Sequence, residues 1–164
     1  MVRKQAVNNS PRESRPPGMK STQASQSLAT VSTVRLVDLP IITDPRGSLS
    51  FAEYGGCLPF LPKRYFIVFD VPEGEVRGAH AHKKTEQFLV CVKGSVSILV
   101  DDGRHKEEVT LSSAAVGLYI PPNIWATQQN YSPDAVLLVL SSGTYDPDEY
   151  VKDYDEFRNV STSR

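Results

Sequence analysis

Short apolar segments separated by polar turns recur along the chain from about residue 34 onward. Most of them are rich in Val, Ile, Phe or Tyr, and several alternate apolar with polar residues, which is the pattern of β-strands. The Asp102-Gly103 pair between two such segments is a typical hairpin turn. The predicted strands are Val34–Leu39, Leu49–Ala52, Tyr65–Val71, Glu86–Val92, Ser95–Val100, Glu107–Leu111, Gly117–Ile120 and Ala135–Leu140.

Eight or more short strands at this spacing predict an all-β sandwich or barrel of the jelly-roll type. Only the C-terminal pattern is helical. The Asp146-Pro147 pair suits an N-cap and a first helical position, and Tyr150, Tyr154 and Phe157 recur at i, i+4 and i+7. The sequence therefore predicts a short helix over Asp148–Phe157 whose aromatic side chains pack on the barrel.

The chain divides into three parts by composition. Residues 1–32 are rich in Ser, Gln, Asn, Pro and Thr and have few large apolar side chains, so they are predicted to be a disordered extension. One folded domain is predicted over residues 33–158, which is long enough for a hydrophobic core. Residues 159–164 are predicted to form a flexible tail.

Charge and composition exclude several function classes. The 18 Lys and Arg residues and 19 Asp and Glu residues give a net charge of −1, so no overall field favours nucleic acid or a membrane surface. No apolar run approaches the roughly 20 residues that span a bilayer, and no secretion signal is visible. Cys57 and Cys91 are predicted to be reduced thiols. We therefore expect a cytoplasmic protein that binds neither nucleic acid nor membrane.

The segment His80-Ala81-His82 carries the most specific chemistry. Residues two apart on a strand project to one face, so both imidazoles are expected to point into the same space. Such a pair is typical of a metal site, a proton-transfer site, or both. Glu86 is a third potential ligand; alternatively it orients a histidine or pairs with Lys84. His105 lies beside the predicted turn and is expected to be exposed.

The histidines lie in a pattern that resembles the first cupin motif, with one extra residue in its last gap: Gly74-x5-His80-x-His82-x3-Glu86-x7-Gly94. The second cupin motif corresponds here to Pro121-x-Asn123-x2-Ala126-x3-Asn130. Ala126 stands where the family has its fourth metal ligand, and alanine has no lone pair. The resemblance implies a cupin jelly roll. The substitution argues against a metal or other cofactor, although three ligands can suffice in catalytic sites.

Longer segments are similar to the sugar 3,4-ketoisomerases of the WxcM-like group, over about residues 34–158. Those enzymes act on dTDP-4-keto-6-deoxyglucose and are metal-free relatives of the 3,5-epimerase of the dTDP-rhamnose pathway. The resemblance also implies a homodimer. The segments that carry it are Arg77–Lys84, Glu86–Cys91, Val116–Pro122, Ser132–Leu140 and Tyr145–Tyr150.

The implied reaction converts dTDP-4-keto-6-deoxyglucose to a dTDP-3-keto-6-deoxyhexose. It needs a base to remove the C-3 proton, a donor to stabilise the enediol(ate), and an acid to return a proton at C-4. Histidine titrates near the operating pH and suits this task. The resemblance implies that His80 and His82 are catalytic, with His82 the first choice to shuttle the proton and His80 the oxyanion donor or partner acid.

Substrate binding needs cations for the diphosphate. Arg46 resembles the arginine of an Asp-x-Arg-Gly turn in the 3,5-epimerases, and Arg77 is a second candidate. Tyr119 and Trp125 are expected to stack on thymine or line the sugar pocket, or else to be core or dimer-interface groups. Gln128 is expected to hydrogen-bond a sugar hydroxyl.

Two functions other than a sugar ketoisomerase also fit the sequence. One is a metal-dependent cupin enzyme such as a dioxygenase, and the other is a non-catalytic module that binds nucleotide sugars. Metal content separates the first from a ketoisomerase, and dTDP binding without turnover would identify the second. The product's configuration at C-4 and the nucleotide base stay open.

Overall fold

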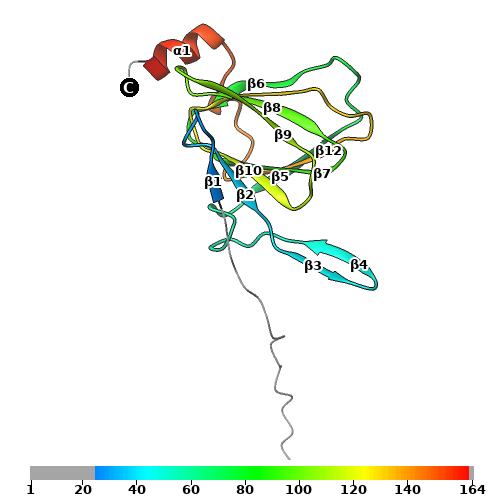
Figure 1. Cartoon of the computed structure of the whole chain (residues 1–164). Coiled ribbons are helices and arrows are strands. Elements are labelled where there is room, and N and C mark those ends of the chain that lie inside the picture. Colours follow the sequence, from blue (N-terminus) through cyan, green and yellow to red (C-terminus); the bar gives the residue numbers. More distant parts are fainter. Residues whose placement is uncertain (1–24, 163–164) are drawn as a thin grey trace, which may run out of the picture.

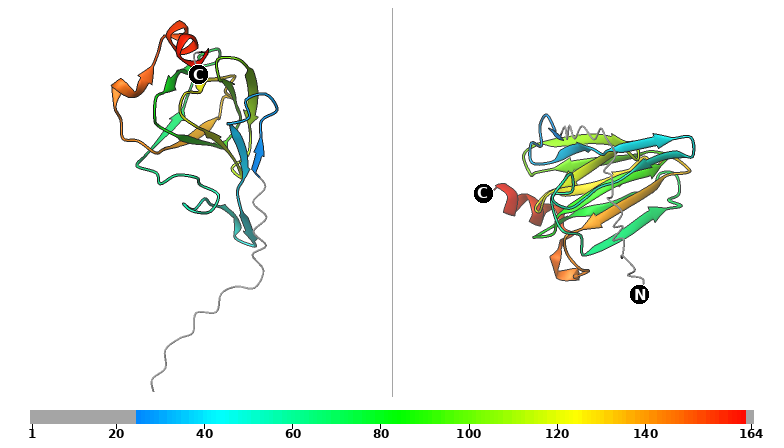
Figure 2. Two further views of the ribbon diagram at one scale, coloured as in Figure 1. Left: turned by 90° about the vertical axis from the view of Figure 1, so that its left-hand side faces the viewer. Right: turned by 90° about the horizontal axis from the view of Figure 1, so that it is seen from below.

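Two antiparallel sheets face each other in a computed structural model that describes residues 25–162 (Figures 1 and 2). The six-stranded sheet has the order β1-β2-β10-β7-β12-β5, and the five-stranded sheet has the order β13-β6-β11-β8-β9. A separate hairpin, β3-β4, projects from one end of the sandwich (Figure 1).

The strands in chain order are β1 (Ser25–Ser27), β2 (Arg35–Asp38), β3 (Ile41–Asp44), β4 (Gly47–Ser50), β5 (Arg64–Phe69), β6 (Arg77–His82), β7 (Gln87–Lys93), β8 (Val96–Asp101), β9 (Lys106–Leu111), β10 (Val116–Ile120), β11 (Trp125–Gln129), β12 (Val136–Ser141) and β13 (Tyr150–Val151). The 3-10 helix η1 (Pro147–Glu149) precedes β13, and the helix α1 (Tyr154–Thr162) follows it.

Each of the eight strands predicted from the hydrophobic pattern overlaps an observed strand, so the all-β prediction is confirmed. The histidine-bearing β6, which the motif implied, is also present. Four strands were not predicted: β1, β3, β11 and β13. They are short, and they lack the sustained alternation of apolar and polar residues that identified the others.

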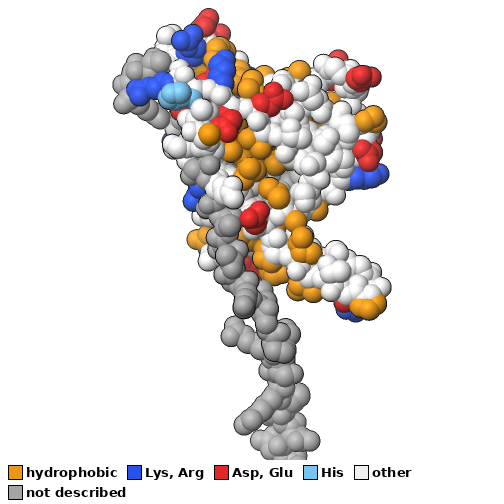
Figure 3. Space-filling model, viewed as in Figure 1, with side chains coloured by type: hydrophobic (Ala, Val, Ile, Leu, Met, Phe, Trp, Pro, Cys, Tyr) orange, Lys and Arg blue, Asp and Glu red, His pale blue; other side chains and the backbone are white. Residues whose placement is uncertain are grey.

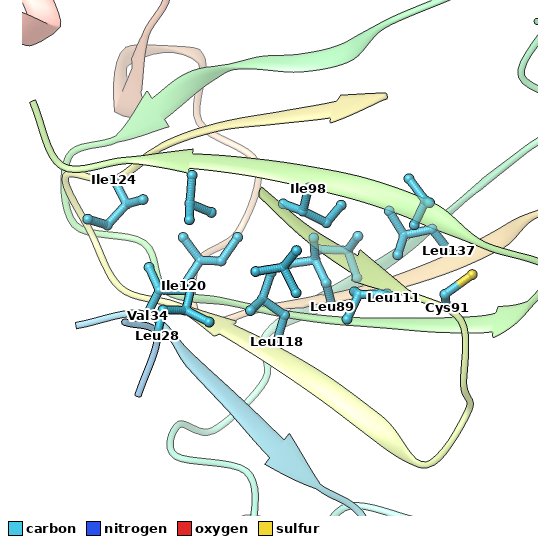
Figure 4. Packing of buried hydrophobic residues seen from close by; sticks show 14 of the residues in the cluster. Leu28, Val34, Leu89, Cys91, Ile98, Leu111, Leu118, Ile120, Ile124 and Leu137 are labelled. Atoms are coloured by element: carbon cyan, nitrogen blue, oxygen red, sulfur yellow. The ribbon is translucent and has the colours of Figure 1, made fainter. Parts of the chain in front are cut away.

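The main hydrophobic core fills the space between the two sheets (Figure 4). Leu89, Leu118 and Leu137 of the six-stranded sheet share this cluster with Ile98 and Val100 of the five-stranded sheet, and each is fully buried. Because strand side chains alternate between faces, the same strands also present residues to the outer faces. Burial of these side chains is the main source of stability in a sandwich of this kind.

Two smaller clusters cover the outer faces of the sheets. On the six-stranded sheet, Phe88 and Tyr119 pack with Phe60 from the segment between β4 and β5. On the five-stranded sheet, Trp125 packs beneath Phe157 of α1. Tyr119 and Trp125 therefore lie on the outer faces of the sheets, away from the space between them.

The C-terminal prediction was partly wrong. Asp146 does cap a helix with Pro147 in its first turn, but that helix is the single 3-10 turn η1. The chain then pairs with β6 as β13, and the α-helix begins only at Tyr154. Tyr154 and Phe157 pack on Trp125 as expected, whereas Tyr150 lies in β13 and contacts the histidines.

The predicted domain limits also need correction. Strand β1 pairs with β2, and Leu28 and Val31 are buried in the main core, so the ordered fold begins before residue 33. Helix α1 continues through residue 159 to Thr162, into the predicted tail. The predicted disorder of residues 1–24 lies outside the described residues.

Two further findings concern cysteines and membranes. Cys57 and Cys91 are buried free thiols, in agreement with the prediction. Within residues 25–162, no helix is long and apolar enough to cross a membrane.

Candidate active site

Strand β6 presents both histidines to the space between the sheets. His80 pairs with Ala126 of β11, which packs against the main core, and His82 pairs with Tyr150 of β13. Ala81 between them faces outward and pairs with Trp125. The alternation expected from the His-x-His spacing is therefore present, and Ala126 lies directly opposite His80.

An extra residue interrupts β6 before the histidines. Gly78 pairs with Thr127 and His80 with Ala126, which leaves Ala79 without a partner on β11. Gly78 and Ala79 both have positive φ, 77° and 54°. A side chain at Gly78 would meet the Ala126 carbonyl oxygen at 2.9 Å, so glycine is required there. This β-bulge changes the phase of the strand and brings Arg77 onto the histidine face.

The two imidazoles contact each other directly. The Nε2 atoms of His80 and His82 are 3.3 Å apart, and the rings are nearly perpendicular. Nδ1 of His80 lies 3.0 Å from the Gly78 carbonyl oxygen, and the Gln87 amide lies 3.1 Å from Nε2 of His82. Nδ1 of His82 is buried and has no hydrogen-bond partner.

These contacts select one arrangement of protons for the neutral pair. A carbonyl only accepts, so Nδ1 of His80 donates to Gly78 and Nε2 of His80 carries a lone pair. The contact between the Nε2 atoms is then a hydrogen bond only if His82 is the donor. Gln87 can turn its amide oxygen toward the same proton. Nδ1 of His82 is therefore the ring nitrogen left with a free lone pair.

The surroundings of the pair favour neutral rings. Burial, the neighbouring His80 and the cation of Arg64 lower the pKa of His82 to about 4, against an opposing effect of Glu149. Burial also lowers the pKa of His80, and Lys152 acts in the same direction. At neutral pH both imidazoles are thus unprotonated, and a neutral imidazole can accept a proton.

Glu86, the third potential ligand of the sequence motif, does not lie beside the histidines. Its carboxylate accepts a hydrogen bond from the Tyr119 hydroxyl at 2.6 Å, on the outer face of the six-stranded sheet. Gln87, one residue later, faces inward and reaches His82. Moving the third motif position to Gln87 also makes the last gap six residues, Gln87-x6-Gly94, which removes the extra residue.

The donor set around the histidines fits a metal poorly. Ala126 supplies no lone pair opposite His80, and the inward-facing Gln87 supplies an amide in place of a carboxylate. Among the described residues, no group of three or more His, Cys, Asp or Glu side chains is placed to hold a metal ion. Only the two imidazoles remain as ligands of the usual kind.

Arg64 and Tyr150 were not predicted as site residues. Arg64 begins β5, and its charge acts on His82. The Tyr150 ring centroid lies 4.8 Å from that of His80 and 4.6 Å from that of His82. The cationic residue at the start of an apolar segment could have identified Arg64 from the sequence. Tyr150 was assigned to the predicted helix because of its spacing from Tyr154 and Phe157, so its position beside the histidines was missed.

Three predicted substrate-binding residues are not beside the histidines. Arg46 is 90% exposed at the tip of the β3-β4 hairpin, where it pairs with Asp44 at 2.6 Å. Tyr119 lies on the outer face of the six-stranded sheet, where burial and Glu86 raise its pKa to about 12. Trp125 lies beneath α1, between Tyr154 and Phe157. Tyr119 and Trp125 are core groups, which was the alternative to a place in the sugar pocket.

Arg77 and Gln128 do share the inner face of the five-stranded sheet. They pair across β6 and β11, and Gln128 is buried and accepts a hydrogen bond from the Tyr131 hydroxyl at 2.7 Å. Arg77 lines a pocket of about 610 Å³ with residues 69–72, 75, 76 and 78. Both residues lie toward the end of β6 away from His82.

The third histidine behaves as predicted. His105 follows the Asp102-Gly103 turn, and its side chain is 58% exposed beside the carboxylate of Asp102. It takes no part in the pair between the sheets.

Comparison with known proteins agrees with this geometry. The sequence model of the family described as "FdtA: WxcM-like, C-terminal" matches residues 32–162. The TDP-4-oxo-6-deoxy-alpha-D-glucose-3,4-oxoisomerase of Aneurinibacillus thermoaerophilus is 44% identical over 124 residues, which cover 76% of this chain and 89% of that protein.

Solved structures give the same result. The TDP-quinovose 3,4-ketoisomerase WlaRB from Campylobacter jejuni is 41% identical, with a TM-score of 0.74 over 77% of this chain and 97% of that chain. A histidine-to-asparagine mutant of the 3,4-ketoisomerase QdtA from Thermoanaerobacterium thermosaccharolyticum, in complex with TDP-4-keto-6-deoxyglucose, is 34% identical. Its TM-score is 0.78, over 80% of this chain and 95% of that chain. The chain therefore belongs to the WxcM-like, C-terminal (FdtA) family, and it is a cupin-type sugar-nucleotide isomerase.

Proposed function

We propose that this isomerase converts dTDP-4-keto-6-deoxyglucose to a dTDP-3-keto-6-deoxyhexose by proton transfer at the His80–His82 pair, without a metal. The observation that carries the proposal is the bonded imidazole pair between the sheets, whose buried surroundings keep both rings neutral and able to accept a proton. The substrate class follows from relatives that bear the names of TDP-sugar 3,4-ketoisomerases.

The steps balance without a redox partner. A base takes the C-3 proton, and the electron pair of that C–H bond forms a C-3=C-4 double bond while the C-4 carbonyl becomes an oxyanion. C-4 is then protonated, the C-3 hydroxyl becomes the new carbonyl, and its proton passes to the C-4 oxygen. His82 serves as the shuttling base, and His80 accepts the hydrogen bond from Nε2 of His82 and so supports the ring when it is protonated.

NMR of dTDP-4-keto-6-deoxyglucose incubated with the enzyme in D2O tests this function. The signals of a 3-keto sugar are expected, with deuterium at C-4 to the extent that the transferred proton exchanges with solvent. The configuration at C-4 is read from the same spectra. Unchanged substrate, together with stabilisation of the protein by dTDP, would instead support a non-catalytic binding module.

Removal of metals is expected to leave turnover within about twofold of the untreated enzyme. The physical reason is that Ala126 and Gln87 occupy the positions from which a metal would need ligands, and neutral imidazoles already supply the base. Metal analysis should accompany the rate measurement. A stoichiometric metal whose removal abolishes turnover, and whose return restores it, would contradict the proposal.

Arg77 and Gln128 remain proposed substrate contacts, since both share the histidine face. Arg46 is a substrate contact only if the β3-β4 hairpin reaches the pocket of a second copy of this chain. The buried free thiols Cys57 and Cys91 support a cytoplasmic location.

We also propose a homodimer, which the distribution of exposed apolar side chains supports. Ile41, Ile42 and Leu49 on the β3-β4 hairpin are each at least half exposed. Tyr65 and Phe69 on β5, the outermost strand of its sheet, are 68% and 59% exposed. Figure 3 shows apolar side chains over the hairpin at the lower right. Exposed apolar groups of this density mark interaction surfaces, and an edge strand offers unpaired backbone groups.

The variant Ile42→Glu is expected to shift the protein from dimer to monomer, because a charge replaces an apolar contact directly opposite Leu49. Analytical ultracentrifugation over a concentration series measures the change. Val160→Glu, at an apolar residue of α1 that is 46% exposed, is the matched control and should leave the dimer intact. A monomeric wild-type protein would contradict the dimer.

A further inference from the structure

Arg64 projects from the six-stranded sheet into the space that the histidines face. It pairs with Ser141 across β5 and β12, and Ser141 pairs with Gln87 across β12 and β7. Directly opposite residues in antiparallel strands share a face, and Gln87 and the fully buried Ser141 face inward. Arg64, Ser141 and Gln87 therefore form one inward row, which ends at His82.

The Arg64 cation has no anionic partner in the described part of the chain. None of the ion pairs found there includes it, and its Nε is buried without a hydrogen-bond partner. Its guanidinium carbon instead lies 5.5 Å from the Phe66 ring centroid and 5.6 Å from the Tyr145 ring centroid. Aromatic faces hold a guanidinium but do not neutralise it.

A partly buried, unpaired charge is costly for a folded protein. Such groups are retained where a ligand supplies the missing partner, so an orphaned donor marks a functional position. The buried Nδ1 of His82 is a second orphaned polar atom, in the residue at the end of the same row. The two orphaned groups are a cation and a base, which is the pair that enolisation requires.

We propose that Arg64 is a catalytic residue that binds the C-4 oxyanion of the enediolate while His82 holds the C-3 proton. This inference rests on the function proposed above. Arg64 lies at the histidine end of the inner face, whereas Arg77 lies toward the opposite end of β6. The charge of Arg64 is therefore assigned to the reacting carbons, and the diphosphate is left to cations farther from the base.

The variant Arg64→Met is expected to lower kcat about a hundredfold, as removal of one oxyanion donor does in other enzymes. Its affinity for dTDP, measured by calorimetry, should stay within about threefold, because dTDP contains the diphosphate but no reacting sugar. Arg64→Lys should recover part of kcat, since it keeps the charge. Lys63→Met, which removes the exposed neighbouring cation, is the matched control and should retain full activity.

The pH profile separates a catalytic from a structural role. His82 is faced by His80, Arg64, Glu149 and Tyr150, and of these His80 and Arg64 lower its pKa. Without Arg64 the pKa of His82 rises, so the acid limb of kcat/KM should move to higher pH. A variant that is merely misfolded would lose activity equally at every pH. NMR titration of the His82 ring checks the same shift without turnover.

The outcomes are distinct. A wild-type enzyme that does not convert the keto sugar would overturn the proposed function, and the role of Arg64 with it. An active wild type with an unchanged kcat in folded Arg64→Met would overturn the role of Arg64 alone. A large loss of dTDP affinity with little change in kcat would assign Arg64 to the diphosphate and also overturn the inference.

Discussion

Replacing His82 by asparagine is expected to reduce kcat about 10³-fold, the typical contribution of a positioned acid–base group. Asparagine retains a polar group of similar size at the position that contacts His80 and Gln87, but its amide cannot accept the C-3 proton. Turnover of dTDP-4-keto-6-deoxyglucose, followed by NMR, gives the rate. The affinity for dTDP should change little.

His105→Asn is the matched control, because it makes the same substitution at an exposed histidine outside the pair. His80→Asn should also slow the reaction, but less, since His80 acts through its hydrogen bond to His82. A folded His82→Asn protein with most of its activity would contradict the assignment. A larger loss in His80→Asn than in His82→Asn would reverse the roles of the two rings.

The second large effect is a loss of stability between pH 6.5 and pH 4. The pKa of His82 falls from 6.5 to about 4 on folding, so in this range the unfolded chain binds a proton that the folded protein does not. The free energy of unfolding is therefore unaffected above pH 6.5 and decreases as the pH falls toward 4. The loss amounts to roughly 3 kcal/mol, more than a hundredfold in the unfolding equilibrium constant.

Urea unfolding at a series of pH values measures this loss, and His80 contributes in the same direction because its pKa is also lowered. His82→Asn should flatten the dependence between pH 6.5 and pH 4, whatever its stability at pH 7. Carboxylates with lowered pKa values, such as Glu107, act mainly below about pH 5, because their unfolded pKa lies near 4.5, so the interval from pH 6.5 to about pH 5 reports the histidines. An equal slope in wild type and His82→Asn would refute the burial of a neutral imidazole.

Hydrophobic patterning was sufficient for the strands that contribute several large apolar side chains to the buried clusters. Leu89 and Leu137 belong to long apolar runs, so β7 and β12 were visible in the sequence. Strand β11 reads Trp-Ala-Thr-Gln-Gln and gave no such signal. Its position is set by pairing with β6 and β8, a tertiary property that no local pattern contains.

The histidine face was predictable because the His-x-His spacing fixes it within one strand. The third motif position was not, because a turn separates it from β6 and an error of one residue reverses the face of the next strand. Glu86 has the carboxylate that a metal ligand needs but faces outward, whereas Gln87 has an amide and faces the histidines. The six-residue gap before Gly94 favours Gln87 as the third motif position, whereas the residue type favours Glu86.

Residues contributed by distant strands were the hardest to predict. Arg64 and Tyr150 approach His82 from β5 and β13, and only the folding of both sheets brings them there. Tyr119 and Trp125 had suitable side chains for a sugar pocket but lie on outer faces. In each case the residue type was known and the face was not.

Because Ala79 is unpaired, Arg77 and His80 are three residues apart in the sequence but oppose residues that are only two apart on β11. Deleting Ala79 would restore strict alternation and leave both pairs, Arg77 with Gln128 and His80 with Ala126, on the inner face. A single gap at this position in an alignment would therefore equate chains that direct this arginine to the same side of the sheet. A relative that keeps all the residues but pairs them without a bulge would turn the arginine to the outer face, and a different strand would then have to supply that cation.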